Sequence, residues 1–145
     1  MIQRIQSLFL LIASAGFWSL FKLPFASSSQ TTTPFFEDQL LTINDHTALL
    51  VLTILGGIIT LGSIFLYNNR GLQIRLGILN IIFSIFLAAV AAWLVFSNAS
   101  SLDTSVEISD KIGLYMPVLS LIMVILANVF IKKDQDFLKS SDRLR

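Results

Sequence analysis

The stretch Asn68-Asn69-Arg70-Gly71-Leu72-Gln73-Ile74-Arg75 joins two long apolar runs, residues 48–66 and 76–96. It is short, and it contains two arginines and no acidic residue. A short connection that carries Lys or Arg stays on the cytoplasmic side of a membrane, because moving these charges across the bilayer is costly. The stretch therefore predicts a membrane hairpin whose turn lies in the cytoplasm.

Composition agrees with a membrane protein. Apolar residues make up 54% of the 145 residues, charged residues only 13%, and the mean hydropathy is +0.78, whereas soluble domains carry about 25% charged residues. A helix needs roughly 20 apolar residues to cross the hydrocarbon core. Four windows meet this need: residues 5–25, 47–67, 76–96 and 113–134. A soluble bundle is the alternative, but it would show a polar face on every helix. We therefore predict an all-α membrane protein, a single domain of four transmembrane helices.

The segments between these helices are polar. Residues 26–46 and 97–112 are predicted to be extracytoplasmic loops, and the conformation of the first is left open between one short strand near Leu40 and a turn. Asn44 and Asp45 are candidate N-cap residues for the second helix. Residues 132–145 are dense in charge and predict a helix that continues beyond the fourth span as a short cytoplasmic helix.

A cleaved signal peptide is the alternative for the first window. Arg4 precedes it, and Ala13-Ser14-Ala15 resembles a cleavage site. The apolar residues nevertheless continue to Phe25, which is long for a signal peptide and suits a span. We therefore interpret the first window as a transmembrane helix.

The distribution of charge fixes the predicted orientation. With both termini and the 68–75 stretch on one side, only Lys22 and Lys111 of the ten basic residues lie on the other. The remaining eight are Arg4, Arg70, Arg75, Lys132, Lys133, Lys139, Arg143 and Arg145. Basic residues accumulate on the cytoplasmic side. This pattern predicts an up-down-up-down topology with both termini in the cytoplasm.

Small and polar side chains recur along each predicted helix. Inside a bilayer, helices associate through close packing at small residues and through interhelical hydrogen bonds. The helix-packing residues predicted on this basis are Gly16, Thr53, Gly56, Thr60, Ser63, Gly77, Asn80, Ser84, Ala88, Ser120 and Asn128. A polar pathway for a solute is the alternative interpretation of the same residues.

The charged residues of the cytoplasmic side predict a second group. The tail supplies acidic residues that can relieve repulsion among the cations, so we expect it to dock beneath the helices as an interfacial helix and to pair with the 68–75 stretch. This predicted charge cluster contains Arg4, Arg70, Arg75, Asp134, Asp136, Asp142, Arg143 and Arg145.

Residues typical of catalysis are scarce. The chain has no cysteine and one histidine, His46, and the three inner spans hold no ionisable residue at depth, where such residues usually mark function. We find no phosphate-binding loop and no nucleophile motif. We therefore expect no cofactor, no metal site and no enzyme activity.

Three short motifs resemble a known family. They are Met1-Ile2-Gln3-Arg4-Ile5-Gln6, Asn69 to Leu76, and Ile131-Lys132-Lys133-Asp134 with the ending Ser141-Asp142-Arg143-Leu144-Arg145. Together they resemble the four-span membrane proteins of Bacteroidetes grouped as domain of unknown function family 4293. The resemblance implies a bacterial inner-membrane location and brings no activity.

The leading functional hypothesis is a non-enzymatic accessory or scaffold subunit with a basic cytoplasmic face. Its expected partners are the lipid bilayer with its anionic headgroups and a membrane protein or second copy of the chain, while the net charge of +1 gives no reason to expect nucleic acid. A small transporter or channel component is the alternative, and a membrane enzyme is a third hypothesis. Charge is absent from the inner spans, and this weakens both alternatives.

Overall fold

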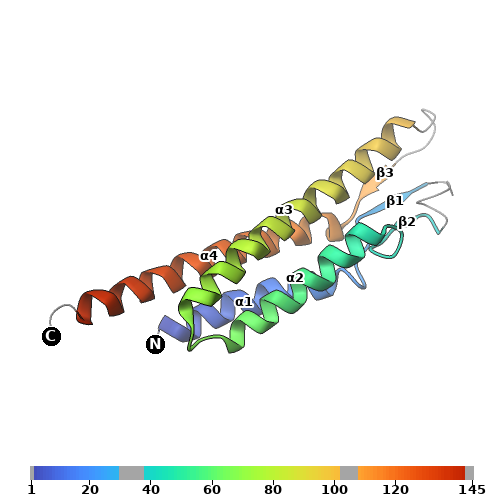
Figure 1. The fold of residues 1–145 in the computed structure, drawn as a ribbon. Coiled ribbons are helices and arrows are strands. Elements are labelled where there is room, and N and C mark those ends of the chain that lie inside the picture. The colour runs from blue at the N-terminus through green and yellow to red at the C-terminus, as the bar shows by residue number, and fades with distance from the viewer. Residues whose placement is uncertain (1, 30–37, 102–107, 143–145) are drawn as a thin grey trace.

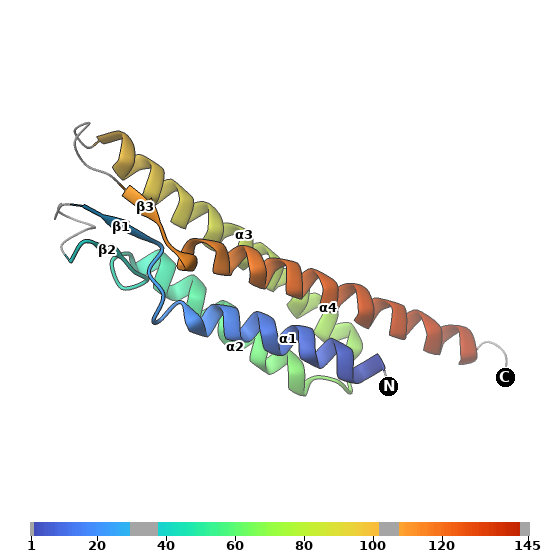
Figure 2. The same cartoon turned by 180° about the vertical axis from the view of Figure 1, so that it is seen from behind.

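Four helices in alternating directions form the body of the protein. The computed structural model describes residues 2–29, 38–101 and 108–142, with side chains for 5–29, 38–97 and 108–137. The helices are α1 (Ile2–Ser19), α2 (Thr47–Phe65), α3 (Arg70–Ser101) and α4 (Ile112–Asp142). Consecutive helices pack together, and α4 also packs along α1, so that each helix has two neighbours. Figures 1 and 2 show the N-terminus, the α2–α3 connection and the C-terminus at one end, here called the turn end.

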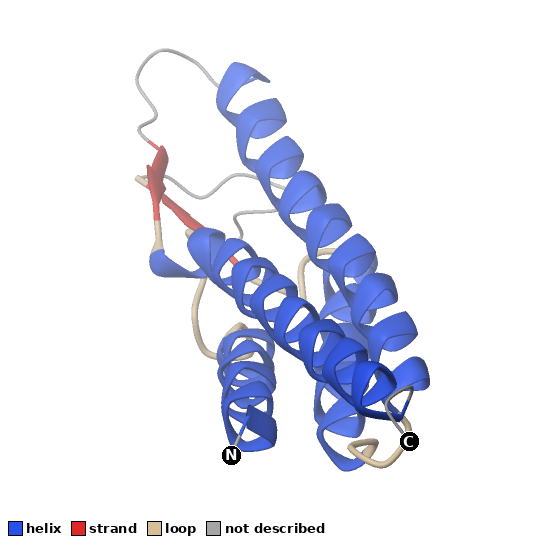
Figure 3. Cartoon of the chain, turned by 90° about the vertical axis from the view of Figure 1, so that its left-hand side faces the viewer, coloured by secondary structure: helices blue, strands red, loops and turns tan. Residues whose placement is uncertain are grey.

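A small antiparallel sheet lies at the opposite end, here called the sheet end (Figure 3). Its strands are β1 (Ala26–Ser28), β2 (Leu40–Leu41) and β3 (Ile108–Asp110), in the order β2-β1-β3. Backbone hydrogen bonds therefore join the two predicted loops to each other. Of the three strands, only β2 had been considered in the sequence analysis, as an alternative to a turn. The sequence signal is weak because strands of two or three residues show no alternation pattern.

The first helix is shorter than predicted. α1 ends at Ser19, not near residue 25, and the chain leaves it through tight turns in which the N–H of Lys22 donates to the carbonyl of Ser19 at 3.0 Å. Pro24 explains this end, because a proline disfavours helical geometry at the residue before it. Leu20 and Phe25 are fully buried and belong to the apolar core at the sheet end.

The other boundaries agree with the prediction only in part. α2 starts at the expected position, but its N-cap is His46, whose Nδ1 accepts from the N–H of Ala48 at 3.2 Å, so the choice of Asn44 or Asp45 was wrong. α3 begins six residues before the predicted window, at Arg70, and reaches Ser101. Charged and polar residues extend a helix beyond its apolar span at little cost, because most of them have adequate helix propensity.

The C-terminal segment is helical and continues the fourth helix, as its sequence predicts. α4 runs unbroken from Ile112 to Asp142, because residues 132–142 contain no glycine or proline to interrupt it. Its last turns project beyond the other helices at the turn end (Figures 1 and 2). The prediction of an interfacial helix docked beneath the bundle was therefore wrong in its geometry.

The outward faces of the helices are apolar. Large exposed side chains include Leu11, Ile58, Ile78, Phe86 and Val129, and soluble monomers rarely expose a continuous apolar surface of this kind. Three segments are long and apolar enough to cross a membrane: Thr47–Phe65, Arg70–Ser97 and Ile112–Phe137. The apolar part of α1, Ile5–Ser19, is shorter. These features indicate a membrane protein.

Candidate functional site

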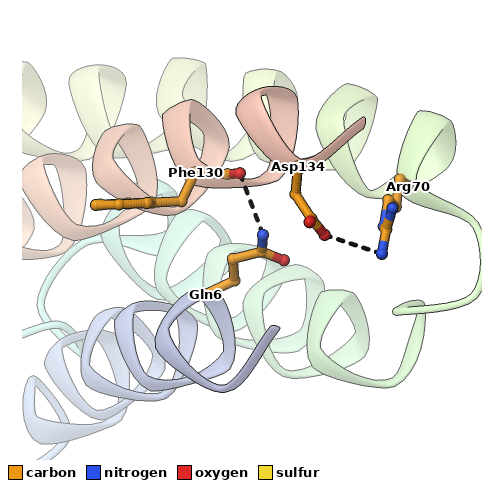
Figure 4. Close-up of polar contacts among 4 residues, drawn as sticks. All are labelled: Gln6, Arg70, Phe130 and Asp134. Atoms are coloured by element: carbon orange, nitrogen blue, oxygen red, sulfur yellow. Dashed lines mark hydrogen bonds and ion pairs between the residues drawn. The ribbon is translucent and has the colours of Figure 1, made fainter. Parts of the chain in front are cut away.

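Polar groups from three helices meet at the turn end (Figure 4). Arg70 Nη2 lies 2.9 Å from Asp134 Oδ2, which joins the start of α3 to α4. One turn away on α4, the carbonyl of Phe130 accepts a hydrogen bond of 3.1 Å from Nε2 of the buried Gln6 on α1. We call Gln6, Arg70 and Asp134 the turn-end cluster, and it holds α1, α3 and α4 together.

The α2–α3 connection positions Arg70. The Asn69 N–H donates to the carbonyl of Leu66 at 2.9 Å, and the Asn69 side chain accepts from the N–H of Leu72 at 3.2 Å. Asn69 thus acts as the N-cap of α3, a position that asparagine favours. The capped turn makes Arg70 the first helical residue, and Figure 4 shows its side chain directed toward Asp134.

The ion pair is largely shielded from water. The side chains of Arg70 and Asp134 are 16% and 12% exposed. Asp134 Oδ2 is close to the guanidinium without the alignment of a hydrogen bond, and Arg70 Nη1 is buried with no hydrogen-bond partner in the described side chains. Removal of one partner from such a pair leaves an uncompensated charge in a poorly solvated place. The pair therefore resists separation of α3 from α4.

A row of buried polar contacts joins α2 to α3. Gln73 Nε2 donates to the carbonyl of Ser63 at 2.9 Å, and Asn80 Nδ2 donates to Thr60 Oγ1. Ser84 Oγ in turn donates to the carbonyl of Asn80 at 2.9 Å. All five side chains are buried. The Ser84 bond lies within α3. The bonds from Gln73 and Asn80 cross to α2 and give the two helices a fixed register, because each polar group would otherwise face hydrocarbon alone.

Glycines permit close approach at the other helix contacts. An ideal Cβ on Gly16 of α1 would overlap the hydroxyl of Ser120 on α4, and one on Gly77 of α3 would overlap the amide of Asn128 on α4. Ser120 Oγ also donates to the carbonyl of Ala13 at 3.1 Å. Such close contacts are how small residues promote helix association in lipid.

The comparisons with known proteins give one match. The family model described as "Domain of unknown function (DUF4293)" matches residues 2–144. The chain belongs to this family. This match confirms the family that the three motifs predicted, which is a family of domains of unknown function. No curated protein and no solved structure matches the chain.

In this DUF4293 domain the predicted helix-packing residues are buried or half-buried. The buried members are Gly16, Thr53, Gly56, Thr60, Ser63, Gly77, Asn80, Ser84 and Ser120, and the half-buried members are Ala88 and Asn128.

Of the predicted charge cluster, the structure brings together Arg70 and Asp134, while Arg75 and Asp136 are exposed. The remaining members lie outside the described side chains, namely Arg4, Asp142, Arg143 and Arg145.

Sequence reasoning placed Gln6 on the packing stripe of the first helix but did not select Gln73, which the structure also places inside the DUF4293 domain. Gln6 and Gln73 are buried, and each donates to a backbone carbonyl of another helix. A signal was present, because Gln73 lies four residues before Gly77 and extends the small and polar stripe of α3 by one turn.

Within the described residues, no group of three His, Asp or Glu side chains could hold a metal ion.

Proposed function

We propose that this protein is a non-enzymatic accessory or scaffold subunit of the bacterial inner membrane, as the resemblance to Bacteroidetes proteins implies. It spans the membrane four times, with the turn end in the cytoplasm. The observation that carries the proposal is the division of charge at that end. Arg70 forms an internal ion pair with Asp134, whereas Arg75 of α3 and Lys132 and Lys133 of α4 are exposed.

The length of α1 supports a fourth span. Its 18 residues extend for about 27 Å at the helical rise, close to the roughly 30 Å of a hydrocarbon core. The aromatic residues Trp18, Trp93 and Tyr115 are exposed toward the sheet end, and Tyr67 is exposed at the turn end. Trp and Tyr concentrate at the two interfaces of a bilayer, so these positions support a membrane placement with the sheet end at one interface and the turn end at the other.

The exposed cations define the kind of partner. A rigid basic surface at the cytoplasmic interface attracts an acidic surface on another membrane protein, because complementary charge speeds encounter and fixes orientation. Anionic headgroups contribute to the same attraction. The turn-end cluster supplies the rigidity, since it ties three helices together beneath these side chains.

A transporter remains the second candidate because of the buried polar row between α2 and α3. Thr53 Oγ1 and Asn80 Oδ1 are buried there without a hydrogen-bond partner in the described side chains. The side-chain amide nitrogens of Gln73 and Asn80 are nevertheless occupied by hydrogen bonds to α2, which favours the scaffold. Solute flux through reconstituted liposomes that is lost in Asn80→Leu, with folding retained, would favour the transporter instead.

Charge reversal at the turn end tests the scaffold. We expect the double variant Arg75→Glu/Lys133→Glu to lose its co-purifying membrane protein in mild detergent by about tenfold or more, because like charges then face the acidic partner. The matched control, Lys22→Glu/Lys111→Glu, changes the same charge at two exposed residues of the sheet end and is expected to retain the partner. Equal recovery from both variants, or no partner with the native chain, would contradict the proposal.

A further inference from the structure

An open groove of about 490 Å³ runs between α3 and α4 near the turn end. One part of it is lined mainly by apolar side chains, namely Ile74 and Ile78 of α3 and Ile125 and Val129 of α4, with Asn128 beside Val129. Its volume lies within the range of small-molecule sites. The groove faces outward, where Ile78 is 52% and Ile125 is 41% exposed. In a bilayer this surface meets lipid and not water.

The other end of the groove is polar. Lys132, Gln135 and Asp136 of α4 line it there. From Ile125 to Asp136 the helix rises by about 16 Å, so the groove changes from apolar to charged along its length. Given the proposed membrane placement, on which this inference rests, the charged end lies at the cytoplasmic headgroup level and the isoleucines lie in hydrocarbon. This is the polarity of a phospholipid molecule lying along the groove.

The two rim charges indicate which headgroup fits. Lys132 and Asp136 are one helical turn apart on the same face, both are exposed, and neither forms an ion pair within the described part of the chain. An ammonium donor binds phosphate oxygens, and a carboxylate binds an ammonium group. A ligand that carries a phosphate beside a primary ammonium therefore satisfies both side chains at once.

We propose that the α3–α4 groove binds phosphatidylethanolamine. Its phosphate contacts Lys132, its ammonium group contacts Asp136, and an acyl chain lies along the isoleucines. A lipid with an anionic headgroup and no ammonium leaves Asp136 uncompensated. A trimethylammonium headgroup brings charge but has no N–H to donate to the carboxylate.

An apolar helix is a poorer occupant of this groove. A helix from a second copy or another protein would cover Lys132 and Asp136 with apolar groups, and charged groups lose free energy when they are desolvated without a partner. A headgroup instead replaces the water at both charges with opposite charge. Charge complementarity therefore favours the lipid.

Native mass spectrometry of the full-length protein tests the site. The purified protein is titrated in mild detergent with phosphatidylethanolamine, phosphatidylglycerol and phosphatidylcholine of the same acyl chains. We expect saturable binding of phosphatidylethanolamine, about tenfold tighter than the other two, as loss of one charge-assisted contact implies. Asp136→Asn should remove this preference, and Lys132→Gln should weaken all three lipids.

Two further variants complete the test. Ile78→Trp fills the groove from an exposed position and should reduce binding of every lipid, whereas Lys133→Gln, an exposed cation that does not line the groove, should leave binding unchanged. Equal binding of the three lipids, an unaltered preference in Asp136→Asn, or a dimer that Ile78→Trp dissociates would overturn the proposal. Arg75 and Lys133 do not line the groove, so a failure of the scaffold test and a failure of the lipid test are separate results.

Discussion

Replacement of Gly56 by leucine is expected to destabilise the protein strongly. An ideal Cβ at Gly56 would lie 2.5 Å from Cε1 and 2.7 Å from Cζ of Phe17 on α1. The Phe17 ring is fully buried, so it has no open space into which to move. Overpacking of a filled contact costs about 1–3 kcal/mol and sometimes more. The melting temperature in detergent should fall accordingly.

Gly62 provides a matched control on the same helix. No atom lies within 4 Å of a Cβ built at Gly62, so Gly62→Leu gains the same helix propensity without a clash. Its melting temperature should equal or exceed that of the native protein. Equal melting temperatures for Gly56→Leu and Gly62→Leu would show that the Phe17 ring does not pack against Gly56 at the α1–α2 contact as the structure has it.

Removal of the Asp134 carboxylate should have the second largest effect. Asp134→Asn leaves the Arg70 guanidinium uncompensated in a place where the side chain is 16% exposed. The expected loss is about 2 kcal/mol, below the range for a fully buried pair because some water reaches both side chains. Thermal unfolding in detergent without added phospholipid measures it.

The neighbouring carboxylate and a double variant separate this loss from a change of net charge. Asp136→Asn removes the same charge at an exposed position and should change stability by less than about 0.5 kcal/mol. Arg70→Gln/Asp134→Asn should lose less than the sum of the single variants, because the two side chains are coupled by about 0.5–3 kcal/mol. Strict additivity would show that the ion pair contributes nothing.

The helices could be predicted because exclusion of charge over about 20 residues leaves few other structures for a chain in a bilayer. Their ends could be predicted only in part, since α2 begins at the expected residue but α1 ends early. The first apolar run continues from Ser19 to Phe25, yet Pro24 ends the helix and the last apolar residues are used in the core of the sheet end. Hydropathy does not distinguish a side chain that faces lipid from one that faces a protein core.

The sheet depends on contacts far apart in the sequence. Ala26 pairs with Leu41 on one side and with Asp110 on the other. Such short strands carry no periodic pattern, and their pairing follows from the helices that bring the three segments together. Residue patterns alone therefore predicted loops at these positions.

The candidate site was predictable in kind but not in detail. Counting charges on one side indicated that an acidic residue of the C-terminal segment pairs with Arg70 or Arg75. Which acidic residue does so depends on the rotation of α4, since Asp134 and Asp136 point about 160° apart around the helix axis. The structure selects Asp134 and leaves Asp136 exposed.

Cysteine labelling tests the proposed topology most directly, because the chain has no cysteine of its own. Single cysteines would replace the exposed Asn44 at the sheet end and the exposed Asn68 in the α2–α3 turn, and a third would be inserted after Met1. With a membrane-impermeant maleimide on intact spheroplasts, we expect labelling of Asn44→Cys alone, and labelling of the other two only after permeabilisation. Labelling of Asn68→Cys or of the N-terminal cysteine in intact spheroplasts would contradict four spans with both ends in the cytoplasm.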